Sequence, residues 1–114
     1  MINKDIILVG INARYSHSSF GLRYLYANLY EYQEKAKIVE FVINENPQTL
    51  AEQILKYQPK IIGIGVYIWN ASDVSCLIET IKKVSPEVKI ILGGPEVSHL
   101  PIRVNTNDAD YIIQ

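Results

Sequence analysis

Three runs of residues in this chain are apolar almost without interruption, and they restrict the fold more than any other feature. The runs cover residues 6–11, 61–68 and 88–92 and are rich in Ile and Val. Continuous apolarity indicates burial on both faces, as in parallel strands that are covered by helices. A further run at 37–43 contains charged residues, which predicts an edge strand, and a short run at 111–113 predicts a fifth strand.

Segments with helical spacing of apolar residues lie between these runs. The first helix is expected around residues 22–29 and the third around 74–81. Asn46 followed by Pro47 is typical of a helix start, with Asn46 as the N-cap. A fourth helix or turn is expected at 96–103, and Cys76 is expected to pack on the apolar side of the third helix.

The alternation of strands and helices predicts an α/β fold with right-handed crossovers. We expect a Rossmann-like, flavodoxin-like doubly wound sheet of five parallel strands in the order 2-1-3-4-5, with helices on both faces. Residues 1–114 form one domain in this interpretation. Because the fifth strand has no covering helix after it, we expect the chain to be the N-terminal fragment of a longer protein.

Charge and hydropathy narrow the range of partners. The net charge is −1 and no basic stripe is present, which argues against nucleic acid as a partner of this domain. No apolar run approaches the roughly 20 residues of a membrane span. The N-terminus leads directly into a strand without a signal peptide, which predicts a cytoplasmic location. The single cysteine, Cys76, cannot form an internal disulfide or hold an iron–sulfur cluster by itself.

Ligands of open parallel sheets bind outside the carboxyl ends of the strands, where the winding changes direction. The segments after strands one, three and four are therefore the candidate site, and each is rich in hydroxyls, aromatics or glycines. The candidate cofactor-binding residues are Asn12, Tyr15, Ser16, His17, Ser18 and Ser19, then Gly65, Tyr67, Trp69 and Asn70, and finally Gly93, Gly94, Pro95 and Glu96.

Several of these residues also have a purely structural interpretation. Ser18 or Ser19 is a plausible N-cap of the first helix, and Asn70 of the third. Gly65 is equally consistent with close packing of a helix. Two consecutive glycines, Gly93 and Gly94, exceed what a tight turn requires and favour a ligand lying flat against the main chain. His17 and His99 are more typical of solvated or structural histidines than of metal ligands.

Four segments together resemble a known family. They read NARYSHSS at 12–19 with LRYL at 22–25, IGIGVYIWN at 62–70, ILGGPEVS at 91–98 and ADYII at 109–113. In their order and spacing they resemble the N-terminal cobalamin-binding (vitamin B12-binding) domain of cobalamin-dependent radical S-adenosylmethionine proteins. The resemblance covers nearly the whole chain.

The resemblance implies a Rossmann-like domain that binds the corrin across the strand ends and holds the nucleotide tail at the side of the sheet, with the glycine pair beside the tail. Gly65-Val66-Tyr67 stands where the family has a Ser-x-Leu-like element. Relatives of the methionine-synthase type carry Asp-x-His-x-x-Gly after strand one. Here Tyr15 replaces the Asp and His17 precedes Gly21 by four residues, so we expect no protein ligand to the cobalt.

The resemblance also implies that cofactor binding and radical chemistry belong to different domains of the parent protein. Radical chemistry in this family needs a Cys-x-x-x-Cys-x-x-Cys site for a 4Fe-4S cluster, which the chain lacks. S-adenosylmethionine and the cluster are therefore expected only in a downstream radical S-adenosylmethionine domain. The chain alone is expected to hold cobalamin without catalytic residues of its own, for an enzyme of methyl transfer or a related radical reaction.

Two alternatives remain at this point. A flavodoxin-like carrier of flavin mononucleotide would also have hydroxyls after strand one and aromatics such as Tyr67 or Trp69 beside the flavin. A cofactor-free interaction domain of the same fold is the other. A phosphoacceptor receiver domain is excluded, because Gly10, Asn12 and Tyr67 stand where its acidic residues would be.

Overall fold

The computed structural model describes residues 3–12, 20–43, 45–67, 70–93 and 109–112. Five strands form one sheet: β1 (Ile6–Asn12), β2 (Ala36–Val42), β3 (Ile61–Gly65), β4 (Lys89–Gly93) and β5 (Tyr111–Ile112). The helices are α1 (Phe20–Ala27), α2 (Pro47–Leu55) and α3 (Ala71–Val84), with a 3-10 helix, η1, at Tyr30–Lys35.

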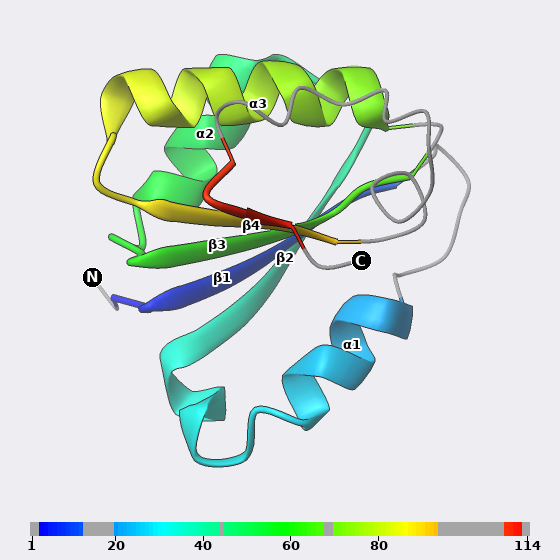
Figure 1. Ribbon diagram of the computed structural model, residues 1–114, viewed down its shortest axis with the longest axis vertical. Helices are drawn as coiled ribbons and strands as arrows, with labels where there is room; N and C mark the ends of the chain where they lie inside the picture. The colour runs from blue at the N-terminus through cyan, green and yellow to red at the C-terminus, as the bar shows by residue number, and fades with distance from the viewer. Residues whose placement is uncertain (1–2, 13–19, 44, 68–69, 94–108, 113–114) are drawn as a thin grey trace.

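All pairings in the sheet are parallel, and the strand order is β2-β1-β3-β4-β5. This confirms the predicted fold class and the order 2-1-3-4-5, with β2 at an edge. The arrowheads of β1, β3 and β4 point toward the same side of the molecule (Figure 1). The connection from β1 to β2 runs toward one edge of the sheet, and the connection from β3 to β4 runs toward the other edge. The winding therefore reverses between β1 and β3.

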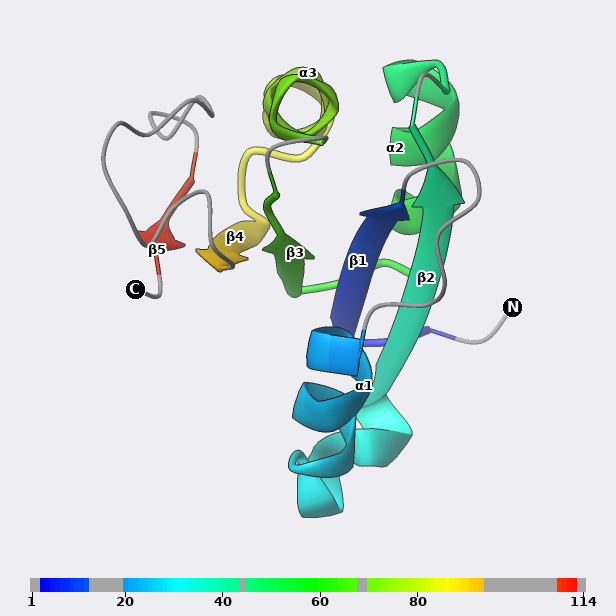
Figure 2. The ribbon, with the colours of Figure 1, turned by 90° about the vertical axis from the view of Figure 1, so that its right-hand side faces the viewer.

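The main core lies between the sheet and the pair α2 and α3. Alternate strand residues such as Val9, Ile64 and Leu92 are completely or almost completely buried there, against Ile54 of α2 and Ile78 of α3. Figure 2 shows α2 and α3 on one face of the sheet and α1 on the other, under β1 and β2. In the part of the chain that the structure describes, no helix covers β3 and β4 on the α1 face.

One prediction about the helices is confirmed and another is wrong. The side chain of Asn46 accepts a hydrogen bond from the backbone N–H of Gln48 at 2.8 Å, which confirms the predicted cap of α2. Cys76 is exposed, so the prediction that it packs on the apolar side of α3 is wrong. The buried face of α3 carries Val74, Leu77 and Ile78, and at 100° per residue Cys76 points away from it.

Two boundaries differ from the sequence pattern. The third strand was expected to extend to residue 68 but ends at Gly65, where the hydrogen bonds of the following turn replace those of the sheet. The 3-10 helix η1 had no sequence signal, and Tyr30 at its start has a positive φ of 52°. The predicted helix or turn at 96–103 lies outside the described residues.

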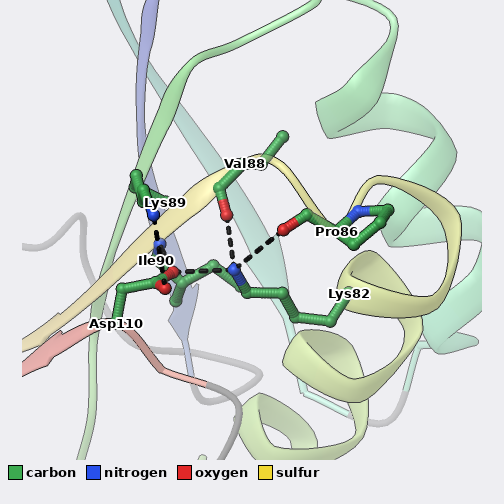
Figure 3. A network of polar contacts seen from close by, with 6 residues as sticks. All are labelled: Lys82, Pro86, Val88, Lys89, Ile90 and Asp110. Atoms are coloured by element: carbon green, nitrogen blue, oxygen red, sulfur yellow. Dashed lines mark hydrogen bonds and ion pairs between the residues drawn. The ribbon is translucent and has the colours of Figure 1, made fainter.

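A polar network fixes the short strand β5 to β4 (Figure 3). One carboxylate oxygen of Asp110 accepts from Lys82 Nζ at 2.7 Å and from the backbone N–H of Ile90 at 2.8 Å. Lys82 also donates to the carbonyl of Val88 at 2.6 Å, and Lys89 lies 4.0 Å from the other carboxylate oxygen. The hydrogen bond from Lys82 holds the pKa of Asp110 below its usual value, against the opposing effect of burial.

Candidate functional site

The sheet forks at its carboxyl edge between β1 and β3. These two strands pair only as far as Val9 and Ile64. Beyond that point β1 continues with β2 as far as Asn12, and β3 continues with β4 as far as Gly65. The fork lies at the reversal of the winding, which is where ligands of doubly wound sheets bind.

Asn70 closes the base of this fork. Its side chain is 1% exposed, and it donates from Nδ2 to the carbonyl of Ile11 at 2.9 Å and to that of Gly65 at 3.1 Å. Its Oδ1 accepts from the backbone N–H of Tyr67 at 2.8 Å. Asn70 occupies the predicted N-cap position of α3, but its side chain makes no cap hydrogen bond. Asn70 is therefore the N-cap residue of α3, as predicted, but its side chain bonds across the fork and not to the first turn of the helix.

Tyr67 lies two residues after the end of β3 and is half-buried. A Cβ atom on Gly65 would lie 3.4 Å from Cε2 of the Tyr67 ring, so the ring packs beside the glycine. Together with the Asn70 hydrogen bond, this contact fixes an aromatic side chain at the carboxyl end of β3. The placement is consistent with the expected aromatic wall of the site.

Gly65 and Gly93 stand opposite each other in the β3–β4 pairing. The backbone N–H of Val66 donates to the carbonyl of Gly93 at 2.7 Å, so the two strand ends are held together. A Cβ on Gly93 would meet no described atom within 4 Å, and the φ of Gly93 lies outside the left-handed region. Neither packing nor backbone conformation within the described residues therefore requires glycine at position 93.

The two glycines face the same side of the sheet as α1. They alternate with core residues such as Ile64, which point toward α2 and α3. Gly10 shares their face, and a Cβ there would lie 3.0 Å from Leu22 of α1. Gly65 and Gly93 thus make a strip of bare backbone at the rim, beside the fork, on the face of the sheet that carries α1.

Asn12 completes the described part of the rim. It is the last residue of β1, its side chain is half-buried, and its carbonyl accepts from the backbone N–H of Ile43 at 2.9 Å. A Cβ on Gly10 would be 3.8 Å from Asn12 Oδ1, so this amide lies on the α1 face with the glycine strip. The structure thus brings Asn12, Gly65, Tyr67, Asn70 and Gly93 together at one edge.

The remaining predicted residues lie outside the described part of the chain. They are Tyr15, Ser16, His17, Ser18, Ser19, Trp69, Gly94, Pro95 and Glu96, and His99 lies there too. The rim residues that are described carry no charge at neutral pH and offer amides, backbone groups and one phenol. Such a surface offers hydrogen bonds to a ligand without a fixed charge.

Sequence reasoning missed the main-chain partners of Asn70. Carbonyl groups carry no sequence signal, so the carbonyls of Ile11 and Gly65 were not candidates. The spacing offered a partial indication, because Asn70 stands five residues after the last strand glycine and directly before a helix. This spacing identified Asn70 as a candidate residue, but it did not indicate which groups the side-chain amide of Asn70 binds.

Other described surfaces are less well suited to a ligand. A hollow of about 360 Å³ lies at the amino ends of β1 and β2 and is lined by Lys4, Arg23 and Lys37. Lys4 donates to a backbone carbonyl of η1 and Arg23 pairs with Glu40 at 3.5 Å. Among the described residues, no three His, Cys, Asp or Glu side chains gather in a way that would hold a metal ion. No described helix is both long enough and apolar enough to cross a bilayer.

Comparison with known proteins bears directly on this edge. The family model described as the B12 binding domain matches residues 6–114, from the first residue of β1 to the last residue of the chain. No curated protein sequence matches.

A crystal structure of a cobalamin-binding protein from Desulfitobacterium hafniense DCB-2 has a similar fold, with a TM-score of 0.61 at 16% sequence identity. The similarity covers 98% of this chain and 53% of that protein, so the chain spans about half its length.

Proposed function

Because this chain belongs to the B12 binding domain family, we propose that it acts as a cobalamin-binding module. The observation that carries the proposal is the bare strip of Gly65 and Gly93 beside the fork between β1 and β3. Among the described residues, no atom lies within 4 Å of the place where a Cβ of Gly93 would stand, and this place adjoins the edge where doubly wound sheets bind cofactors.

The described residues fit such a cofactor. A corrin is broad, flat and edged with amide groups, and the uncharged rim of Asn12, Tyr67 and backbone groups suits those features. We propose that the nucleotide tail lies along the strip at Gly65 and Gly93, where a main chain without side chains allows close approach. When bound, cobalamin supplies a cobalt centre that carries methyl groups or takes part in radical reactions.

The residues of the chain bind and orient the cofactor in this proposal. Tyr67 forms a wall at the end of β3, and Asn12 offers an amide at the end of β1. The segments that follow the strands complete the site with Tyr15, Ser16, Ser18, Ser19, Trp69, Gly94, Pro95 and Glu96. His17 contacts the cofactor without ligating the cobalt, so the domain contributes no metal ligand.

We further propose that the domain is the N-terminal part of a longer cytoplasmic enzyme. The chain spans about half of the similar cobalamin-binding protein, and it lacks the cysteine triad of a radical S-adenosylmethionine cluster. S-adenosylmethionine and the 4Fe-4S cluster would be held by a downstream domain. That domain would also cover the outer face of the corrin, so the isolated chain is expected to bind cobalamin weakly.

Titration of the chain with hydroxocobalamin, followed by the visible spectrum, tests the function. Saturable binding to wild type is expected, and flavin mononucleotide is titrated in parallel. A chain that takes up flavin and leaves cobalamin free would replace the proposal with the flavodoxin-like alternative. If neither this chain nor its longer parent binds cobalamin, the proposal is wrong.

Substitution of Gly93 tests the site itself. The Cβ that Gly93→Val adds would meet no described atom within 4 Å, and valine is favoured in strands, so the fold should keep its stability. Cobalamin affinity should fall at least about tenfold, the equivalent of about 1.4 kcal/mol. Lys37→Val, which adds the same side chain at an exposed position of β2, is the control and should bind like wild type. If Gly93→Val bound cobalamin as tightly as wild type does, the strip of Gly65 and Gly93 would not be part of the binding site.

A further inference from the structure

The hydrogen bonds of Asn70 indicate a role other than the predicted contact with a cofactor. Both hydrogens of its carboxamide are donated to main-chain carbonyls, one on each side of the fork. Its oxygen accepts the N–H of Tyr67. With the side chain only 1% exposed, Asn70 has no donor left to offer a ligand.

The two carbonyls belong to strands that no longer pair with each other. Pairing of β1 with β3 stops at Val9 and Ile64, and the carbonyls of Ile11 and Gly65 lie beyond that point. Two strands that diverge would leave polar main-chain groups facing each other without donors. A single amide with two hydrogens satisfies both carbonyls and fixes the distance between the strand ends.

The same amide fixes the turn between β3 and α3. The bond from the Tyr67 N–H holds the turn closed over three residues, and Tyr67 packs beside Gly65. A backbone bond from the Asn70 N–H to the Tyr67 carbonyl at 3.2 Å reinforces the turn. The side chain of Asn70 therefore helps to fix the position of Tyr67 relative to the end of β1.

We infer that Asn70 is a positioning residue, which sets the width of the fork and the place of Tyr67 and thereby prepares the ligand site without touching the ligand. This inference rests on the proposed function only in that cobalamin is the probe of the site. It also revises the prediction that Asn70 itself contacts the cofactor.

Asn70→Asp is the sharpest test, because it keeps the shape of the side chain and the acceptor for Tyr67 but removes both donors. Hydroxocobalamin affinity should fall at least tenfold. Asn46→Asp makes the same chemical change at the start of α2, where Asp is an equally good cap, and should bind within about twofold of wild type.

A purely structural role would act through stability alone. Ile54→Val shortens a fully buried core side chain and thereby lowers the stability of the fold without touching the fork. All variants are titrated at a temperature where circular dichroism shows each to be folded. Asn70→Asp should bind more weakly than Ile54→Val, and equal binding of Asn70→Asp and wild type would overturn the inference.

A measurement on wild type decides the matter even if Asn70→Asp does not fold. The carboxamide hydrogens of Asn70 should exchange slowly with solvent in NMR spectra both before and after addition of hydroxocobalamin. Loss of that protection on binding, with a new contact from the amide to the cofactor, would make Asn70 a direct ligand residue and overturn the inference. Failure of wild type to bind cobalamin would instead contradict the proposed function.

Discussion

Gly10 and Gly93 show how one residue type serves two different purposes. Both lie in strands and face the same side of the sheet as α1. At Gly10 a Cβ would approach Cδ1 of Leu22 in α1 to 3.0 Å, whereas at Gly93 it would meet no described atom within 4 Å. The first glycine lets a helix pack on the sheet, and the second leaves space at the rim.

This contrast predicts opposite effects of one substitution. Gly10→Val should lower the free energy of unfolding by about 1–3 kcal/mol, because the Leu22 side chain of α1 must move to admit the new side chain. Gly93→Val should leave it unchanged or slightly higher. Urea unfolding of both variants, followed by circular dichroism, measures the difference. Equal stability of Gly10→Val and wild type would show that Leu22 moves aside at no cost.

At the scale of the elements, the periodicity of apolar residues predicted which strands and helices exist, and in what order, better than it predicted where each of them ends. Ile and Val runs identified all five strands, and their alternation with helices gave the strand order. The end of β3 was misplaced, since Val66 and Tyr67 are as apolar as the strand before them. Their turn depends on hydrogen bonds to Asn70, which come from tertiary structure and leave no local pattern.

The candidate site was predictable to a similar degree. The topology rule identified the edge, so Asn12, Gly65, Tyr67 and Gly93 were expected together and are found at one rim. The role of Asn70 was not predictable, because its partners are main-chain carbonyls of two strands that lie 59 and five residues away. The prediction for Cys76 was wrong for a different reason, since the helical period was clear but Cys76 was assigned to the wrong face of the helix.

β5 depends on a side-chain network as well as on its own pairing. It is two residues long, and Asp110 attaches it to Lys82 of α3 and to the β4 backbone. The side chains of Lys82 and Asp110 are 17% and 25% exposed. An ion pair with this degree of burial and a charge-assisted backbone bond contributes more than an exposed pair does.

Asp110→Asn should therefore lower the free energy of unfolding at pH 7 by about 1–2 kcal/mol. The folded pKa of Asp110 lies below that of the unfolded chain. The carboxylate thus stabilises the fold above about pH 4 and loses this effect as the pH falls through the folded pKa. Wild type should lose more stability than Asp110→Asn between pH 5 and about pH 2.

Urea unfolding across that pH range measures the effect. Lys89→Met is the matched control, because Lys89 is 59% exposed and lies 4.0 Å from the same carboxylate. Its stability should stay within about 0.5 kcal/mol of wild type. Parallel pH profiles of wild type and Asp110→Asn would show that the network does not govern the acid response.

The whole molecule brings the rim together from distant parts of the chain. Asn12 and Gly93 are the last residues of β1 and β4, Tyr67 follows β3 by two residues, and the three come together only in the folded sheet. An unfolded chain offers no such surface, so a ligand of the rim binds the native state alone. Binding must then raise the free energy of unfolding by an amount set by the ligand concentration.

Hydroxocobalamin at about 100 times its dissociation constant should stabilise the chain by about 2.7 kcal/mol. For a domain of this size, that increment raises the melting temperature by roughly 10 °C or more. Thermal unfolding followed by circular dichroism, at several cobalamin concentrations, measures the shift, and Gly93→Val should need a higher concentration for the same shift. A visible spectrum that reports binding while the melting temperature stays constant would place the cofactor on a surface that survives unfolding, and not at the fork between β1 and β3.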